Sequence, residues 1–290
     1  MTTGVIFDID GVLVDVRRSY RRAIVETVAR EHDAKIDQAL IDRFKRAGRF
    51  NNDWDLTTAA AMAVELERHS DGDRHRFTAA VADAGGGLAG AAVALIDAVG
   101  GAAAERITAR VDPERLREVF QTVYLGDALY AELEGETAPF AADGLIHDEP
   151  VLIDAETVAT VESVAAVGVV TGRPAAEAQI ALERTPLSVD PAAVVTMDDA
   201  HADKPDPAGL LAVAATLDAE RVYFIGDTVD DMTAATAAAT ADTARTYVGV
   251  GVTGAGDAEG TGEHLVAAGA DVVVETVRAV PAVLADDGIL

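Results

Sequence analysis

The fold is decided by Gly4-Val5-Ile6-Phe7-Asp8-Ile9-Asp10-Gly11, near the start of the chain. A short apolar run leads into two aspartates and a glycine, which is typical of a buried strand that ends in a tight turn. The apolar spacing then becomes helical and predicts a helix with Asp15 as its N-cap. A strand followed by a helix favours an α/β architecture.

Downstream of residue 150, strand and helix patterns alternate. Helices are expected between the strands, one of them with Asp206 as N-cap and Pro207 as its first residue. This alternation predicts a Rossmann-like three-layer sandwich around a parallel sheet, formed by residues 1–15 and 150–290. Further strands are expected at residues 167–171, 194–196, 222–225, 247–248 and 272–274.

Residues 16–149 form a second, α-helical domain inserted after the first strand, because apolar residues recur there mainly at helical spacing. A Gly/Ala-rich stretch, 84–104, interrupts the pattern and is either a weak helix or a mobile insertion. The Pro/Gly-rich acidic stretch 135–150 reads as a linker back to the core.

The composition is strongly acidic. The 290 residues include 50 acidic and 23 basic ones, a net charge of −27, which disfavours nucleic acid and anionic membranes as partners. Only three lysines occur, and an acidic, lysine-poor surface suggests a salt-rich, halophilic cytosol. No cysteine and no signal peptide are present, so we expect a soluble cytoplasmic protein, either a monomer or a homodimer.

Polar residues follow four of the predicted strands. Because ligands bind at the carboxyl ends of the strands in open parallel sheets, these residues are expected to meet in one crevice. Clustered carboxylates favour a hard cation such as Mg²⁺, and a metal with a lysine and a hydroxyl suits a phosphoryl group. Asp8 could then attack phosphorus, while Asp10 protonates the leaving oxygen and later activates water. The residues in question are Asp8, Asp10, Thr171, Gly172, Lys204, Asp227, Asp230 and Asp231.

Four motifs in this order resemble those of the haloacid dehalogenase superfamily of hydrolases: Asp8-Ile9-Asp10-Gly11-Val12-Leu13, Thr171, Lys204-Pro205 and Gly226-Asp227-Thr228-Val229-Asp230-Asp231. The resemblance implies Asp8 as nucleophile and Asp10 as general acid/base. It implies Mg²⁺ on Asp8, the Asp10 carbonyl and Asp227, with Asp231 or its neighbour Asp230 supporting the metal. It implies that Thr171 and Lys204 hold the phosphoryl group. The helical insertion resembles the superfamily's C1-type cap.

Several other residues are candidates for binding substrate. Arg17 and Arg18 belong to a basic cluster that either forms an anion-attracting rim or a solvated helix face. Arg49, Asn51 and Asn52 form a polar cluster in the insertion that could recognise a substrate. Arg173 lies close enough to Thr171 to reach a leaving group, although a salt bridge is an equal alternative.

These residues together predict a Mg²⁺-dependent phosphatase that acts on a small phosphorylated metabolite. The dehalogenase branch of the superfamily lacks the second aspartate, so Asp10 favours phosphate-ester hydrolysis. A phosphomutase on the same scaffold and a non-catalytic metabolite-binding module remain the alternatives. Phosphoglycolate, sugar phosphates, nucleotides and histidinol phosphate all remain possible substrates.

Overall fold

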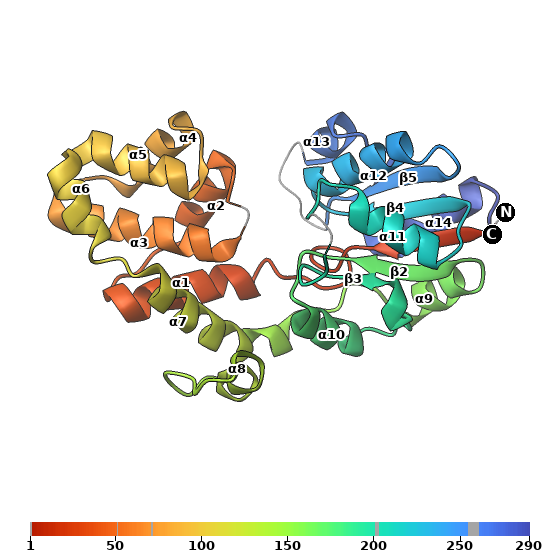
Figure 1. Cartoon of the computed structure of the whole chain (residues 1–290), viewed down its shortest axis with the longest axis horizontal. Coiled ribbons are helices and arrows are strands. Elements are labelled where there is room, and N and C mark those ends of the chain that lie inside the picture. Colours follow the sequence, from red (N-terminus) through yellow and green to blue (C-terminus); the bar gives the residue numbers. More distant parts are fainter. Residues whose placement is uncertain (1, 51, 71, 201–202, 255–260) are drawn as a thin grey trace. The chain divides into compact units, whose positions relative to one another are not determined.

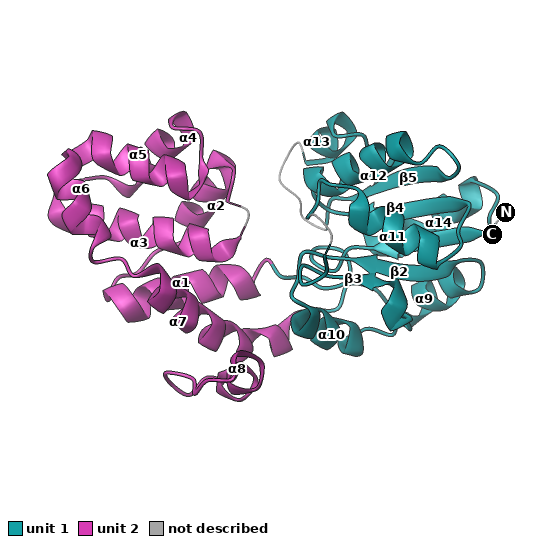
Figure 2. Ribbon diagram, in the orientation of Figure 1, with its two compact units in different colours: residues 1–16, 150–290 teal, residues 17–149 magenta. Residues whose placement is uncertain are grey.

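The computed structural model describes every residue except 1, 51, 71, 201–202 and 255–260. It divides the chain into two compact units (Figure 2). The core unit consists of residues 1–16 and 150–290, and the helical unit consists of residues 17–149. The chain therefore leaves the core unit after its first strand and returns to it once.

The core unit contains a six-stranded sheet in the order β3-β2-β1-β4-β5-β6, and every pairing in it is parallel (Figure 1). The first strand, β1, lies at the centre between β2 and β4, so the chain order reverses beside it. The sheet confirms the predicted parallel α/β architecture. Its strands are β1 (Thr3–Phe7), β2 (Ala166–Val170), β3 (Val194–Val195), β4 (Arg221–Gly226), β5 (Thr246–Val252) and β6 (Val272–Val274).

Helices cover both faces of the sheet, because alternate residues of its central strands point to two separate cores. Val5 and Phe7 of β1 join a core with α9 (Ala155–Glu162), α10 (Ala175–Arg184) and α14 (Val280–Asp286). Ile6 joins the opposite core with α11 (Ala208–Thr216) and α12 (Val229–Ala241). Burial on both faces explains the continuous apolar run in β1. The remaining helix of the core unit is α13 (Thr261–Ala267), and the short 3₁₀ turns are η2 (Pro191–Ala193) and η3 (Val277–Ala279).

The helical unit is built around α3 (Asp53–His69), which contacts six other helices. Residues 56–66 of α3 are all buried, so this helix is covered on every side. The other helices of the unit are α1 (Ser19–His32), α2 (Gln38–Ala47), α4 (Arg74–Asp83), α5 (Gly87–Val99), α6 (Gly101–Thr108), α7 (Pro113–Leu125) and α8 (Asp127–Glu134), and its 3₁₀ turn is η1 (Leu145–Asp148).

The Gly/Ala-rich stretch is helical, since α5 and α6 together span most of residues 84–104. Within the described ranges, no single helix is long and apolar enough to cross a bilayer. Among the helices of the described residues, α4 and α5 taken together reach that length and composition, and they are bent by 117° relative to each other.

Two predicted helix starts are wrong. Helix α1 begins at Ser19 with Arg18 as N-cap, because the chain before it is extended: Val14 bridges to Val151, and the Asp15 amide donates to the carbonyl oxygen of Pro150 at 2.8 Å. Helix α11 begins at Ala208 with Pro207 as N-cap. Asp206 still accepts a hydrogen bond from the Ala208 amide at 2.9 Å, so its side chain caps the helix from one position further out.

Candidate active site

Asp8 lies at the carboxyl end of the central strand. Its amide donates to the carbonyl oxygen of Ile225 at 2.9 Å, which extends the β1–β4 pairing by one residue. Its Oδ1 accepts from the Ile9 amide at 2.8 Å, and only 4% of the residue is exposed. The sheet therefore holds this carboxylate in a fixed place at the edge where ligands of such folds bind.

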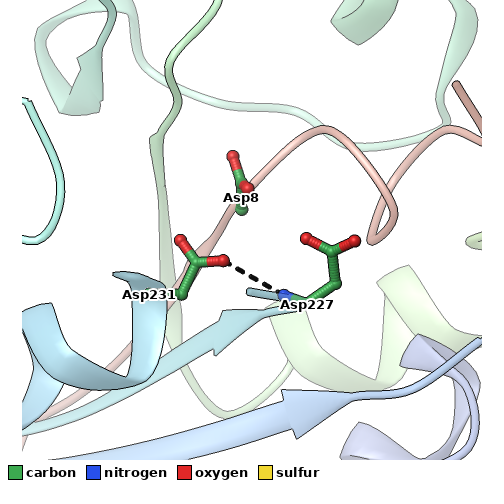
Figure 3. A group of neighbouring side chains, drawn as sticks. All are labelled: Asp8, Asp227 and Asp231. Atoms are coloured by element: carbon green, nitrogen blue, oxygen red, sulfur yellow. Dashed lines mark hydrogen bonds between the residues drawn. The ribbon is translucent and has the colours of Figure 1, made fainter. Parts of the chain in front are cut away.

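Two more carboxylates reach the same place from the neighbouring strand. Asp227 follows β4, and Asp231 lies in the first turn of α12. One oxygen from each of Asp8, Asp227 and Asp231 lies within 4.8 Å of the others (Figure 3). Asp230, by contrast, is exposed, so the structure places Asp231 in the cluster rather than its neighbour.

Asp231 is fully buried, and its Oδ2 is fully hydrogen-bonded. Its Oδ2 accepts from the amides of Asp227 and Thr228, at 3.1 and 3.0 Å, and from the Thr228 hydroxyl at 2.7 Å. The Thr228 hydroxyl in turn accepts from the Asp231 amide, which completes a capping box at the start of α12. Asp231 thus fixes the loop that carries Asp227.

Lys204 neutralises part of this negative charge. Its Nζ lies 2.9 Å from Oδ2 of Asp8 and 2.6 Å from Oδ1 of Asp231, and 15% of its side chain is exposed. Burial by itself lowers the pKa of Lys204, but the charges of Asp231 and Asp8 outweigh that effect and raise it. The ammonium group therefore stays charged beside Asp8.

One ammonium does not balance three carboxylates. Burial raises the pKa of Asp8 to about 7 in spite of Lys204, and the charges of Asp231 and Asp10 add to that effect. Burial likewise raises the pKa of Asp227 well above its usual value, again with help from neighbouring carboxylates. A cation at this point would remove the repulsion, so the donor set fits a hard, oxygen-binding metal ion.

Two glycines make room for the cluster, a role that the sequence pattern does not predict. A Cβ on Gly11 would lie 1.9 Å from Oδ2 of Asp227, and its φ of +72° also favours glycine. A Cβ on Gly226 would lie 2.3 Å from the Cβ of Asp231. The available signal was that each glycine is adjacent in sequence to a candidate aspartate at a strand end.

Thr171 and Gly172 follow β2, the strand on the other side of β1. Thr171 is buried, and its hydroxyl accepts from the Arg173 amide at 3.2 Å. Gly172 is exposed, and nothing lies within 4 Å of where its Cβ would be. This leaves open space beside the strand end at which the phosphoryl group is expected.

Arg173 and Asp10 form an ion pair. The Nε of Arg173 lies 2.5 Å from Oδ1 of Asp10. The Arg173 side chain is 1% exposed, whereas the Asp10 side chain is 31% exposed. Of the two predicted roles for Arg173, the structure shows the salt bridge.

The other predicted substrate residues belong to the helical unit. Arg17 and Arg18 are exposed immediately before α1, and Arg49 is exposed with a φ of 58°. Asn52 is the N-cap of α3, because its Oδ1 accepts from the Asp55 amide at 2.8 Å. Asn51 lies outside the described residues. Substrate contact by these residues stays a prediction.

A model of the haloacid dehalogenase-like hydrolase family matches residues 2–239. The chain belongs to this family. The match confirms the resemblance indicated by the four motifs, and it includes all the carboxylates of the cluster.

Solved structures share the hydrolase's fold. A phosphatase, Tt82, from Thermococcus thioreducens is 23% identical with a TM-score of 0.60, over 80% of this chain and 86% of the other. A phosphonoacetaldehyde hydrolase-like protein from Oleispira antarctica is 16% identical with a TM-score of 0.56, over 98% and 92%. A hydrolase from Pseudomonas syringae is 21% identical with a TM-score of 0.51, over 98% and 99%. At these identities the likeness concerns the fold.

One curated protein also matches, over a short stretch. The imidazoleglycerol-phosphate dehydratase of Phytophthora nicotianae is 46% identical over 52 residues. That stretch is 18% of the hydrolase and only 11% of the dehydratase, so the hydrolase spans a small part of that relative's length.

Proposed function

We propose that this hydrolase is a Mg²⁺-dependent phosphatase that forms a phosphoryl intermediate on Asp8. The observation that carries the proposal is the position of Asp8. It is a buried carboxylate at the end of the central strand, its Oδ2 lies 2.9 Å from Nζ of Lys204, and Asp227 lies beside it. A phosphoryl group brought there would meet a nucleophile and a fixed positive charge together.

The metal would bind to Asp8 and Asp227, and the family resemblance adds the main-chain carbonyl of Asp10. Both oxygens of Asp231 already accept hydrogen bonds or an ion pair, so Asp231 is better suited to support the site from behind. When bound, Mg²⁺ would offset the charge of the carboxylates and of the phosphoryl oxygens.

The reaction has two steps. First, a carboxylate oxygen of Asp8 attacks phosphorus, the bond to the leaving oxygen breaks, and Asp10 gives that oxygen a proton to release an alcohol. Water then attacks the phosphorus of phospho-Asp8, Asp10 takes its proton, and the bond to Asp8 breaks to release phosphate. Thr171, Gly172 and Lys204 would hold the phosphoryl oxygens in both steps.

The helical unit would act as the cap that selects the substrate, a small phosphorylated metabolite. Arg17, Arg18, Arg49 and Asn52 would supply its polar contacts, and closure would exclude water during the first step. The dehydratase relative is named for an imidazole-bearing phosphate ester, so imidazoleglycerol phosphate joins histidinol phosphate, phosphoglycolate, sugar phosphates and nucleotides as a candidate substrate.

The test is phosphate release from a panel of these esters, including histidinol phosphate and imidazoleglycerol phosphate, in molar KCl with Mg²⁺ or with EDTA. We expect metal-dependent release from at least one ester. Asp8→Asn should reduce it by at least about 1,000-fold while leaving the thermal unfolding curve in place. Asp286→Asn, a change at an exposed aspartate of α14, is the matched control and should keep full activity.

Two outcomes would redirect the proposal. A phosphate-shifted isomer formed without free phosphate would indicate a phosphomutase. Binding of an ester by a folded protein, with no turnover under any condition, would indicate a metabolite-binding module. Full activity in Asp8→Asn would rule out the phospho-Asp8 mechanism.

A further inference from the structure

Arg173 is held more rigidly than its partner. Its amide donates to the Thr171 hydroxyl at 3.2 Å, and its carbonyl oxygen accepts from the Met197 amide at 3.0 Å. With a side chain 1% exposed, its guanidinium has little room to move, whereas Asp10 is about one-third exposed. The ion pair therefore fixes the carboxyl group of Asp10 to the end of the neighbouring strand.

The contact distinguishes the two oxygens of Asp10. Oδ1 lies 2.5 Å from the Nε of Arg173, while Oδ2 makes no hydrogen bond within the described part of the chain. An N–H donor at Oδ1 is compatible with both forms of the acid, because the carboxylic proton can occupy the other oxygen. Only Oδ2 is then placed to give or take a proton.

We propose that Arg173 is the positioning residue of the acid/base step, holding Asp10 by Oδ1 so that Oδ2 faces the leaving oxygen and later the attacking water. This inference rests on the proposed phosphatase function. Arg173 acts through Asp10, because its Nε is held by the Asp10 carboxylate. The contact is a single charge-assisted hydrogen bond, which is stronger than a neutral one, and the buried guanidinium gives it a fixed direction.

The test compares two leaving groups in Arg173→Met, which keeps a long apolar stem without the charge. An alkyl phosphate, the best ester found in the panel, needs a proton on its leaving oxygen, whereas p-nitrophenyl phosphate does not. The measured quantity is kcat/KM, which covers only the steps up to loss of the leaving group. We expect a loss of about 30-fold for the alkyl ester and less than about threefold for the aryl ester.

A double-mutant cycle with Asp10→Asn completes the test. If Arg173 acts only through Asp10, then Arg173→Met should change the alkyl rate by less than about twofold in the Asp10→Asn background. Where Arg173→Met does not fold, Arg173→Lys takes its place in both arms, with a smaller loss expected for the alkyl ester.

The outcomes distinguish a failure of the positioning role of Arg173 from a failure of the proposed phosphatase function. Equal losses on both esters, or the same loss with and without the Asp10 carboxylate, would overturn the positioning role while the phosphatase function stands. If the wild-type protein releases phosphate from neither ester, the proposed function itself fails, and the role of Arg173 fails with it.

Discussion

At the scale of single residues, the site depends on a glycine that has no side chain as much as on the aspartates around it. Gly11 has a φ of +72°, and its absent side chain leaves the space that Oδ2 of Asp227 occupies. A methyl group there would collide with a carboxylate proposed to bind the metal. The tight turn after β1 and the position of Asp227 are therefore one constraint, although the two residues are far apart in sequence.

Gly11→Ala is expected to lower Mg²⁺-dependent phosphate release by at least about tenfold and to raise the Mg²⁺ concentration required for half-maximal activity. The strained φ alone should cost about 1 kcal/mol or more of unfolding free energy. Gly135→Ala is the matched control, because Gly135 has a φ of +71° and no atom lies within 4 Å of its Cβ position. Equal behaviour of the two variants in the metal titration would contradict the steric explanation.

At the scale of elements, the strand ends can be predicted from the sequence because the apolar run of each strand stops where the polar residues of the site begin. The run Val5-Ile6-Phe7 becomes Asp8, and strand β4 ends at Gly226 just before Asp227, so both the elements and their polar ends could be located from the sequence. Helix α1 begins later than predicted because Val14 and Asp15 pair in extended conformation with the returning chain at Pro150 and Val151, which local periodicity cannot reveal. Local pattern does not predict the partner of Arg173 for the same reason, since Asp10 lies 163 positions away.

Helix packing in the helical unit also depends on a contact between distant elements. Glu65 of α3 is 4% exposed, and its Oε1 lies 3.0 Å from Nδ1 of His32 at the end of α1 and 2.9 Å from Nη1 of Arg68. Arg68 also donates to the carbonyl oxygens of His32 and Asp33, which closes the end of α1. A buried carboxylate thus anchors one helix end to another helix.

Glu65→Gln should lower the free energy of unfolding by about 2–4 kcal/mol, because it removes a buried charge that its partners surround. Hydrogen bonds from His32 and Arg68 outweigh burial and lower the pKa of Glu65. A lowered carboxyl pKa contributes stability that is present above the unfolded value of about 4.5 and is lost as pH falls through the folded value. The difference in stability between wild type and variant should therefore shrink below about pH 4.5.

Chemical denaturation at pH 7 and pH 4 measures this difference. Glu26→Gln is the control, since Glu26 pairs with Arg22 on the surface of α1, where an exposed pair contributes about 0.5 kcal/mol or less. A pH-independent difference for Glu65→Gln would exclude the charge as its cause.

At the scale of the whole molecule, the charge is unevenly divided. Residues 1–16 and 150–290 contain 26 acidic residues and six basic ones, among which Lys204 is the only lysine. The core unit therefore carries most of the net charge of −27. The same unit contains the site proposed to bind a phosphate ester, which is itself an anion. Mutual repulsion of like charges opposes both the compact state and the approach of the substrate.

Potassium chloride should therefore stabilise the protein and lower the KM for the phosphate ester. Molar salt reduces the Debye length to about 3 Å, so repulsion between surface carboxylates is largely screened. We expect the first thermal transition at pH 7 to rise by roughly 5–10 °C between 0.1 and 2 M KCl, which corresponds to about 2–3 kcal/mol for a domain of this size. Near pH 4.3, the pI of the sequence, the net charge vanishes, and the same addition of salt should raise the transition much less. An equal rise at both pH values would assign the effect to salt acting on apolar burial and not to the acidic surface.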